Sequence, residues 1–234
     1  MKSEKKCVVV TGCSKGLGFY ITQRLLALDY QVLGCARTKP DLEHDDFYFI
    51  PCNLADAGDR GRFLGHVKKG RYSIYGLVNN AAMGALNQFL TTPTEKVEEV
   101  MQANYLANFE LSRELAKLMT KAGEGRIIHI GSQTVLLKTP LEAAYAASKA
   151  AVETMMKISA KELAAMGITV NMVSPGVMET DIIRGIPKER IDYMLAEQVT
   201  PKPLAFNDVW HAVYLLLSPD ALRITGQNIY VGVA

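Results

Sequence analysis

The feature that most constrains the fold is an alternation, along the whole chain, between short apolar runs and longer segments of helical periodicity. The short runs are rich in β-branched residues and almost wholly apolar, as in Val8-Val9-Val10 and Ile127-Ile128. Strands of this kind are covered on both faces, whereas half-exposed strands alternate apolar with polar residues. The alternation therefore predicts an α/β fold with a doubly wound, parallel sheet of about seven strands and helices on both faces.

The predicted elements follow one another without an internal repeat or a low-complexity linker, so we expect a single domain over residues 1–234. The predicted strands are 7–11, 31–35, 47–51, 74–78, 126–130, 168–173 and 227–231, and the predicted helices are 17–28, 57–69, 94–121, 143–166 and 207–217. Segment 177–203 is rich in charge and methionine and follows a strand, which favours a lid over a substrate. A helical hairpin on the surface is the alternative.

Composition excludes several classes of protein. Hydrophobic residues make up 49% of the chain and the net charge is +2 without a long run of either sign, so we expect no nucleic acid as a partner. No apolar window approaches the ~20 residues of a membrane span, and we expect neither a membrane segment nor a signal peptide. The four cysteines, without CxxC spacing, predict no metal site and a reducing cytoplasm: Cys7, Cys13, Cys35 and Cys52.

A glycine-rich loop follows the first predicted strand and opens the first predicted helix, with the sequence TGCSKGLG from Thr11 to Gly18. Backbone N–H groups and a helix dipole can meet a pyrophosphate at such a place. Gly12 permits a tight turn, Gly16 removes a side chain where backbone approaches phosphate, and Gly18 lets the helix pack close to the sheet. Three glycines that only form turns would read the same way. The loop favours a Rossmann-type dinucleotide site that also includes Ser14, Lys15 and Leu17.

The end of the second predicted strand indicates which dinucleotide binds. It lacks the acidic residue that would hold an NAD ribose hydroxyl and carries Arg37 instead, while Lys15 lies in the glycine loop. Two cations near the adenosine ribose would bind a 2′-phosphate through charge-assisted hydrogen bonds, which favours NADP(H). Either residue could instead be an ordinary solvated surface charge.

Tyr145 and Lys149 are four residues apart on a predicted helix and so lie on the same face, one turn from each other. An ammonium beside a phenol lowers the pKa of the phenol, which would make Tyr145 an acid–base group. Ser132 follows a predicted strand, where its hydroxyl could polarise a carbonyl. A tyrosine and a lysine at this spacing also occur by chance, and Ser132 could merely cap local backbone.

Asn104 lies inside the predicted helix 94–121, where asparagine is a mediocre helix former. Its amide could hold a water next to Lys149 and relay protons to solvent. A helix residue that faces solvent is the alternative reading.

Taken together, these residues resemble the short-chain dehydrogenase/reductase family over nearly the whole chain. The motifs that carry the resemblance are the TGxxxGxG loop, the run Asn79-Asn80-Ala81-Ala82, Asn104, Ser132, the pair Tyr145 and Lys149, and Pro175-Gly176 with Thr180. They occur in the order and at the spacing of the family.

The resemblance implies a role for each of these residues. Ser132 would position the carbonyl, Tyr145 would be the acid–base group, and Lys149 would tune it and bind ribose. Asn104 would support the relay. The remaining contacts with the cofactor would come from Asn53 and Leu54 at adenine, Asn80 and Ala81 after the fourth strand, and Pro175, Gly176, Val177 and Thr180 at the nicotinamide.

Within the family, the chain looks most like the β-ketoacyl-acyl-carrier-protein reductases, through the spacing from Ser132 to Tyr145 and the segment 175–181. This implies reduction of a 3-oxoacyl thioester by NADPH in a homo-oligomer, a tetramer or a dimer, with an acyl carrier protein as a possible partner.

Four positions depart from the family pattern. Asn53 replaces an aspartate at the adenine contact, and Ala82 replaces a glycine and narrows the pocket on the cofactor side. The tail 230–234 ends where the family commonly continues, which puts a subunit contact in doubt. Met166 takes a place where carrier-protein reductases often present a basic residue, so a protein-borne substrate is in doubt too.

Three functions follow from these residues. The first is reduction of a 3-oxoacyl thioester, and the second is reduction or oxidation of a small carbonyl, sugar, polyol or polyketide. The third is a non-catalytic NADP(H)-binding sensor or scaffold, against which the intact Ser, Tyr and Lys set argues. An apolar substrate is favoured by residues that could line the pocket, although such residues are more often plain core: Met83, Leu86, Val135, Leu136, Met178 and Met194.

Overall fold

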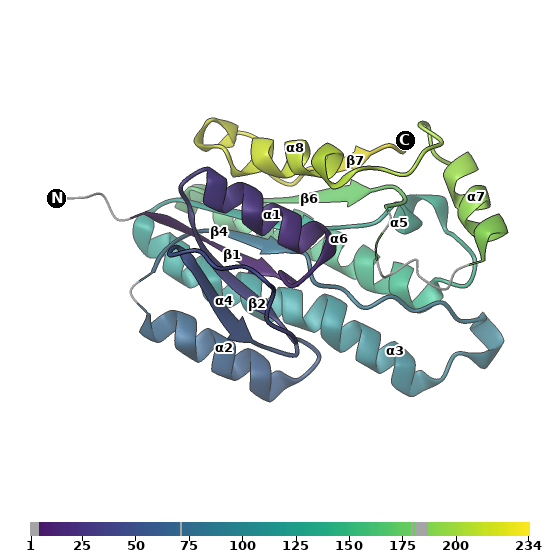
Figure 1. Ribbon diagram of the computed structural model, residues 1–234, viewed down its shortest axis with the longest axis horizontal. Helices are drawn as coiled ribbons and strands as arrows, with labels where there is room; N and C mark the ends of the chain where they lie inside the picture. The colour runs from purple at the N-terminus through teal and green to yellow at the C-terminus, as the bar shows by residue number, and fades with distance from the viewer. Residues whose placement is uncertain (1–4, 71, 179, 181–186) are drawn as a thin grey trace.

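Over the part of the chain that the computed structural model describes, residues 5–70, 72–178, 180 and 187–234, seven parallel strands form one sheet in the order β3-β2-β1-β4-β5-β6-β7 (Figure 1). The strands are β1 (Lys6–Thr11), β2 (Gln31–Ala36), β3 (Phe47–Pro51), β4 (Ser73–Asn79), β5 (Gly125–Ile130), β6 (Ile168–Pro175) and β7 (Asn228–Val231). This arrangement confirms the predicted doubly wound sheet. The direction of winding reverses between β1 and β4, the point at which such sheets bind ligands beyond the carboxyl ends of their strands.

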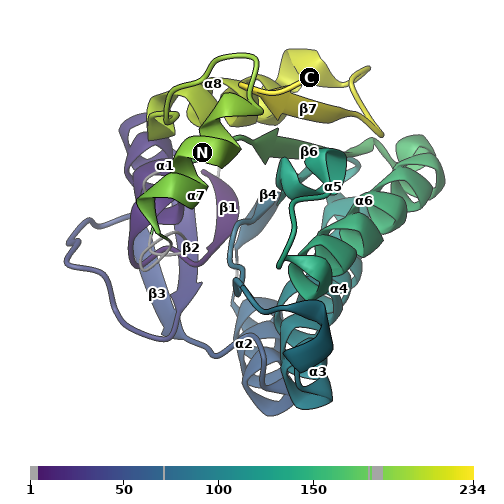
Figure 2. The ribbon, with the colours of Figure 1, turned by 90° about the vertical axis from the view of Figure 1, so that its right-hand side faces the viewer.

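Helices cover both faces of the sheet, as Figures 1 and 2 show. One face carries α1 (Gly16–Ala27) and α8 (Phe206–Leu217), and the other carries α2 (Ala57–Lys69), α4 (Ala107–Ala122) and α6 (Ala143–Leu163). Three shorter helices lie at the end toward which the strands point: α3 (Thr94–Met101), α5 (Thr134–Leu137) and α7 (Lys188–Ala196). Single turns complete the chain at η1 (Phe89–Thr91), η3 (Ala164–Met166) and η4 (Pro219–Ala221).

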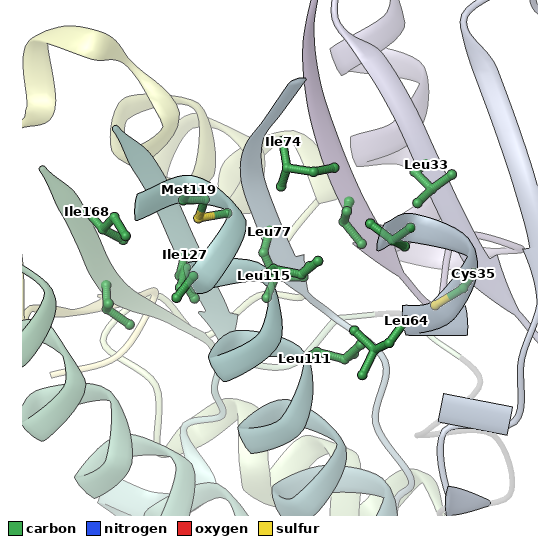
Figure 3. Packing of buried hydrophobic residues seen from close by; sticks show 14 of the residues in the cluster. Leu33, Cys35, Leu64, Ile74, Leu77, Leu111, Leu115, Met119, Ile127 and Ile168 are labelled. Atoms are coloured by element: carbon green, nitrogen blue, oxygen red, sulfur yellow. The ribbon is translucent and has the colours of Figure 1, made fainter. Parts of the chain in front are cut away.

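The apolar strands divide their side chains between two cores, because successive residues of a strand point to opposite faces. Val8 and Val10 pack under α1 and α8, whereas Val9 packs under α2 and α4. The second cluster includes Leu77, Leu111, Leu115, Met119 and Ile127, which converge from β4, α4 and β5 in Figure 3. Both faces are therefore buried, and the sheet forms a packed platform for the residues at its carboxyl edge.

The predicted helix 94–121 is observed as one helical stretch with an irregular turn inside it. It consists of α3 and α4 joined by a π-helical turn, η2 (Gln102–Leu106), which contains Asn104. The side chain of Asn104 bonds to the backbone of Met83 outside the helix, and the wider π turn accommodates this contact. The predicted helix 143–166 similarly ends as an α-helix at Leu163 and finishes in η3.

The predicted lid, 177–203, includes residues 179 and 181–186, which lie outside the described residues. Its described part contains α7 and a bridge that joins Met178 to Leu204. The lid stays a prediction. Among the described helices, none has the length and apolar character needed to cross a membrane. In the same residues, no group of three or more His, Cys, Asp or Glu side chains lies close enough together to hold a metal ion.

Candidate active site

The glycine loop lies at the carboxyl end of β1 and is pressed against both neighbouring strands. Gly12 has a φ of +68°, and its N–H donates to the carbonyl of Cys35 at the end of β2 over 2.7 Å. A Cβ on Gly18 would stand only 2.2 Å from the Gly12 carbonyl oxygen, so no larger residue fits there without displacing backbone. Helix α1 starts at Gly16, and its N-cap Lys15 makes no side-chain capping bond. The first turn of α1 can therefore offer N–H groups to a phosphate.

Asn80 braces this loop from the end of β4. Its Nδ2 donates to the carbonyls of Thr11 at 3.0 Å and of Gly12 at 3.3 Å, while its backbone N–H donates to the Thr11 hydroxyl. The N–H of Ala81 donates to the same hydroxyl at 2.9 Å. The structure thus ties Asn80 to the backbone of the glycine loop and Ala81 to the side chain of Thr11, a residue that the sequence alone does not single out.

The two predicted cations lie in the segments that follow neighbouring strands. Thr11 of β1 pairs with Cys35 of β2, so Lys15 and Arg37 follow strand ends that adjoin each other. Both side chains are exposed, so they are accessible to a phosphate group of a ligand that binds from solution. Ser14 is half-buried and Leu17 is buried within the same loop.

The adenine contacts predicted at Asn53 and Leu54 lie after β3. Asn53 is exposed, and its Oδ1 accepts from the N–H of Ala55 at 3.2 Å, which closes a local turn. The carbonyl of Leu54 accepts from Arg60, whose guanidinium is buried and also pairs with Glu110 at 2.6 Å. Arg60 therefore fixes this loop to α2 and α4. A single basic residue in a predicted amphipathic helix gives no sequence signal of such a role.

Ser132, Tyr145 and Lys149 come together where β5 ends and α6 begins. Lys149 is buried, its Nζ lies 5.7 Å from the centroid of the Tyr145 ring, and it donates to the carbonyl of Ile130 over 2.7 Å. Ser132 follows Ile130 through Gly131, and its hydroxyl is close enough to the phenol to act as a hydrogen-bond partner that lowers the Tyr145 pKa. The structure thus places the three predicted groups in one assembly at the carboxyl edge.

The pKa of Tyr145 shifts in the direction opposite to the one expected from an adjacent ammonium. Burial is the largest influence and raises this pKa to about 12, and the hydrogen bond from Ser132 only partly opposes it. Burial also lowers the pKa of Lys149 to about 8, because an ammonium loses its hydration there. Tyr145 is consequently a protonated phenol at neutral pH.

Asn104 is fully buried, and its side chain is occupied by protein groups. Its Oδ1 accepts from the N–H of Met83 at 2.8 Å, and its Nδ2 donates to the carbonyl of Met83 and to the hydroxyl of Ser148, each at 3.0 Å. Both amide donors are thus used. Asn104 therefore contacts α6 through Ser148, the residue directly before Lys149. Its complete burial excludes the alternative of a helix residue that faces solvent.

The nicotinamide contacts predicted at Pro175, Gly176 and Val177 continue from the end of β6. The N–H of Gly176 donates to the carbonyl of Val231 at 2.9 Å, and the N–H of Val177 donates to the side-chain carbonyl of Gln198. Of Thr180 the structure shows an N–H that donates to the carbonyl of Met178 over 2.8 Å. This segment therefore lies on the same edge of the sheet as Ser132.

Two further polar residues flank the catalytic assembly. Glu142 is the buried N-cap residue of α6, and its carboxylate accepts from the hydroxyl of Thr134. Burial raises the pKa of this carboxyl, and its charge in turn raises the pKa of Tyr145. Gln133 is buried beside Ser132. The sequence gives one signal for Glu142 and Gln133, which is that they lie close in the chain to the predicted catalytic residues Tyr145 and Ser132.

Comparison with known proteins agrees with this geometry. The family model described as short chain dehydrogenase matches residues 6–191, which include the glycine loop, Ser132, Tyr145 and Lys149. The chain belongs to the short-chain dehydrogenase family. It is accordingly an oxidoreductase, and members of this family bind a nicotinamide cofactor.

Several relatives that are similar to this chain over almost its whole length have the same name. The 3-oxoacyl-acyl-carrier-protein reductase FabG of Escherichia coli K12 is 30% identical over 237 residues, which cover 99% of this chain and 97% of that protein. The protein of the same name from Haemophilus influenzae is 32% identical over 232 residues, with 97% and 96% covered. A solved structure of 4-hydroxyisoleucine dehydrogenase complexed with NADH has a TM-score of 0.92 at 25% identity and covers 98% of each chain.

Proposed function

We propose that this short-chain dehydrogenase reduces the ketone of a 3-oxoacyl thioester with NADPH. The observation that carries the proposal is the assembly of Ser132, Tyr145 and Lys149 at the carboxyl edge of the sheet, the edge that also carries the glycine loop. The two FabG proteins, similar over the full length, support the choice of substrate.

The chain's own residues would position the ketone and supply a proton. The hydroxyls of Ser132 and Tyr145 would both donate to the ketone oxygen, because they lie within mutual hydrogen-bonding reach. Bound NADPH would supply the hydride that the carbonyl carbon accepts. Tyr145 would then give its proton to the oxygen, and the ammonium of Lys149 would stabilise the phenolate left behind.

The preference for NADPH rests on charge. Arg37 and Lys15 follow adjoining strand ends, and both are exposed. A 2′-phosphate on the adenosine ribose would bring a negative charge to these cations, whereas NADH brings none. NADH is the alternative, and the structural likeness to a dehydrogenase complexed with NADH supports it.

The second candidate function is oxidation or reduction of a small hydroxylated or keto substrate. Its support is the structural likeness to 4-hydroxyisoleucine dehydrogenase, which extends over 98% of both chains. Met166, exposed on η3 where a carrier-protein reductase often has a basic residue, also weakens the case for a substrate that is attached to a carrier protein. A free thioester and an acyl carrier protein are both candidate forms of the substrate.

We further propose that the protein acts as a homo-oligomer in the cytoplasm. Exposed apolar side chains on the outer helices, among them Phe109 on α4 and Ile158 on α6, support self-association. Cys7, Cys13, Cys35 and Cys52 are all free and buried, which suits a reducing compartment. A dimer and a tetramer remain the two candidate assemblies.

Tyr145→Phe tests the proposed chemistry. Loss of the donated proton is expected to lower kcat for a 3-oxobutanoyl thioester by about a hundredfold or more, with NADPH binding retained. Turnover is measured as NADPH oxidation and binding as a change in NADPH fluorescence. Tyr214→Phe, at an exposed tyrosine on α8, is the matched control.

The same assay separates the candidate functions. A Tyr145→Phe protein with wild-type turnover would refute the proton-donor role. If the wild type oxidises NADPH with small ketones and with no 3-oxoacyl thioester, the second function replaces the first.

A further inference from the structure

Gln133 carries a buried side-chain amide that no group of the described residues satisfies. The residue is only 2% exposed, and neither its Nε2 nor its Oε1 has a hydrogen-bond partner among the described residues. Its backbone is firmly held, because its N–H donates to the carbonyl of Pro175 and its own carbonyl accepts from Leu136 and Leu137. Buried amides are almost always paired, so an orphaned one in a rigid setting requires an explanation.

The amide lies against the turn that follows β6, on the residue next to Ser132. Gln133 directly follows Ser132 and is the N-cap residue of α5, which lies between the end of β6 and α6 in Figure 2. Its Oε1 faces the bare backbone of Gly176, since a Cβ on that glycine would stand 3.3 Å from this oxygen. Because Gln133 is the next residue after Ser132, its amide belongs to the neighbourhood in which the proposed substrate would bind.

The polar side chains around Gln133 already have partners. The Gln198 amide accepts from the N–H of Val177 and donates to the carbonyls of Thr200 and Lys202. The carboxylate of Glu142 accepts from Thr134. Among the described residues, the Ser174 hydroxyl, packed beneath Gly131, and the Nε of Arg190, near Glu142, are also unpaired. Gln133 is thus the amide in this neighbourhood that is left to bind something from outside the chain.

We propose that Gln133 is a specificity-determining residue whose amide N–H binds a second oxygen of the substrate, the thioester carbonyl of a 3-oxoacyl group. This inference rests on the proposed function. In such a substrate the thioester carbonyl lies two carbons from the ketone that Ser132 and Tyr145 hold, and it is an acceptor for the Nε2 donors of Gln133. A site built to bond a substrate oxygen discriminates against an analogue that lacks it, because the buried amide then stays unpaired.

A pair of substrates that differ only in the position of the ketone isolates this contact. The probes are the N-acetylcysteamine thioesters of 3-oxohexanoic and 5-oxohexanoic acid, which carry the same groups at different separations. The measured quantity is the ratio of kcat/KM for the 3-oxo thioester to kcat/KM for the 5-oxo thioester, from NADPH oxidation. The wild type is expected to prefer the 3-oxo thioester.

Gln133→Met keeps an unbranched side chain of similar size and removes both amide groups. It is expected to lower the 3-oxo to 5-oxo ratio by about tenfold. Gln133→Glu, which keeps an acceptor and loses the donors, is expected to lower the ratio as well. Gln88→Met, at an exposed glutamine before η1, is the control and should leave the ratio at the wild-type value.

The ratio separates specificity from structure, because a general loss of fold or of cofactor binding lowers both rates together. If the wild type reduces the 3-oxo thioester and Gln133→Met keeps the same ratio, Gln133 only holds an internal water or a local fold, and this inference is overturned alone. A wild type that reduces neither thioester would overturn the proposed function and this inference with it.

Discussion

His129 should make the native state sensitive to acid well above the pH at which carboxylates are protonated. The imidazole lies in β5, is completely buried, and is within 3.3 Å of the Asn79 amide. Burial and the charge of Lys149 together lower the pKa of His129 from 6.5 to about 3, and burial is the larger of the two causes. The imidazole therefore stays neutral in the folded protein while it titrates normally in the unfolded chain.

The sign and size of the effect follow from proton linkage. Below pH 6.5 the unfolded state binds a proton that the folded state does not, so the free energy of unfolding falls as the pH falls toward 3. The slope is about 1.4 kcal/mol per pH unit, which amounts to about 2 kcal/mol at pH 5. This loss is a sizeable part of the ~5–15 kcal/mol that stabilises a typical domain.

The assay is urea unfolding of the wild type and of His129→Gln between pH 8 and pH 5, with His211→Gln at an exposed position on α8 as the control. The difference in free energy of unfolding between the wild type and His129→Gln should shift by about 2 kcal/mol from pH 7 to pH 5. Contributions from all other groups are shared by the two proteins and cancel. Parallel pH profiles for the two proteins, or an NMR titration of the His129 ring near pH 6.5 in the folded state, would refute the reasoning.

Two further predictions concern the nucleotide site. Gly18→Ala places a Cβ 2.2 Å from the Gly12 carbonyl oxygen, so it should destabilise the fold by about 1–3 kcal/mol and weaken NADPH binding. Gly61→Ala, on α2, is the control, because open space surrounds its Cβ and neither effect is expected. Equal thermal midpoints for the two variants would contradict this prediction. Arg37→Glu should lower the ratio of kcat/KM for NADPH to that for NADH by at least about tenfold, because a carboxylate would repel the 2′-phosphate. An unchanged ratio would show that Arg37 does not read the cofactor.

The sequence predicts the sheet, and it predicts that Ser132, Tyr145 and Lys149 lie close together, because both features depend on local patterns. Strand 31–35 differs from β2 only in its last residue, and strand 47–51 matches β3. Tyr145 and Lys149 lie on one helix, so their spacing alone brings them together, and Ser132 is placed by the end of the strand before it.

Features that depend on distant segments could not be predicted in this way. The π turn at Asn104 leaves helical periodicity intact on either side, so the pattern does not reveal it. The direction of the Tyr145 pKa shift depends on how deeply the phenol is buried, which spacing does not specify. The isolation of the Gln133 amide results from packing against Gly176, which is more than forty residues further along the chain.

The order of strands places the glycine loop and the Ser132 region on different halves of the sheet. The residues that brace the phosphate loop come from β1, β2 and β4, whereas the groups that would handle the substrate come from β5, β6 and the helices after them. Changes in α5, which follows Ser132, could therefore retarget the proposed reaction while the residues that hold the glycine loop stay as they are. A scaffold organised in this way can vary the helices after β5 while β1, β2 and β4 keep the glycine loop in place.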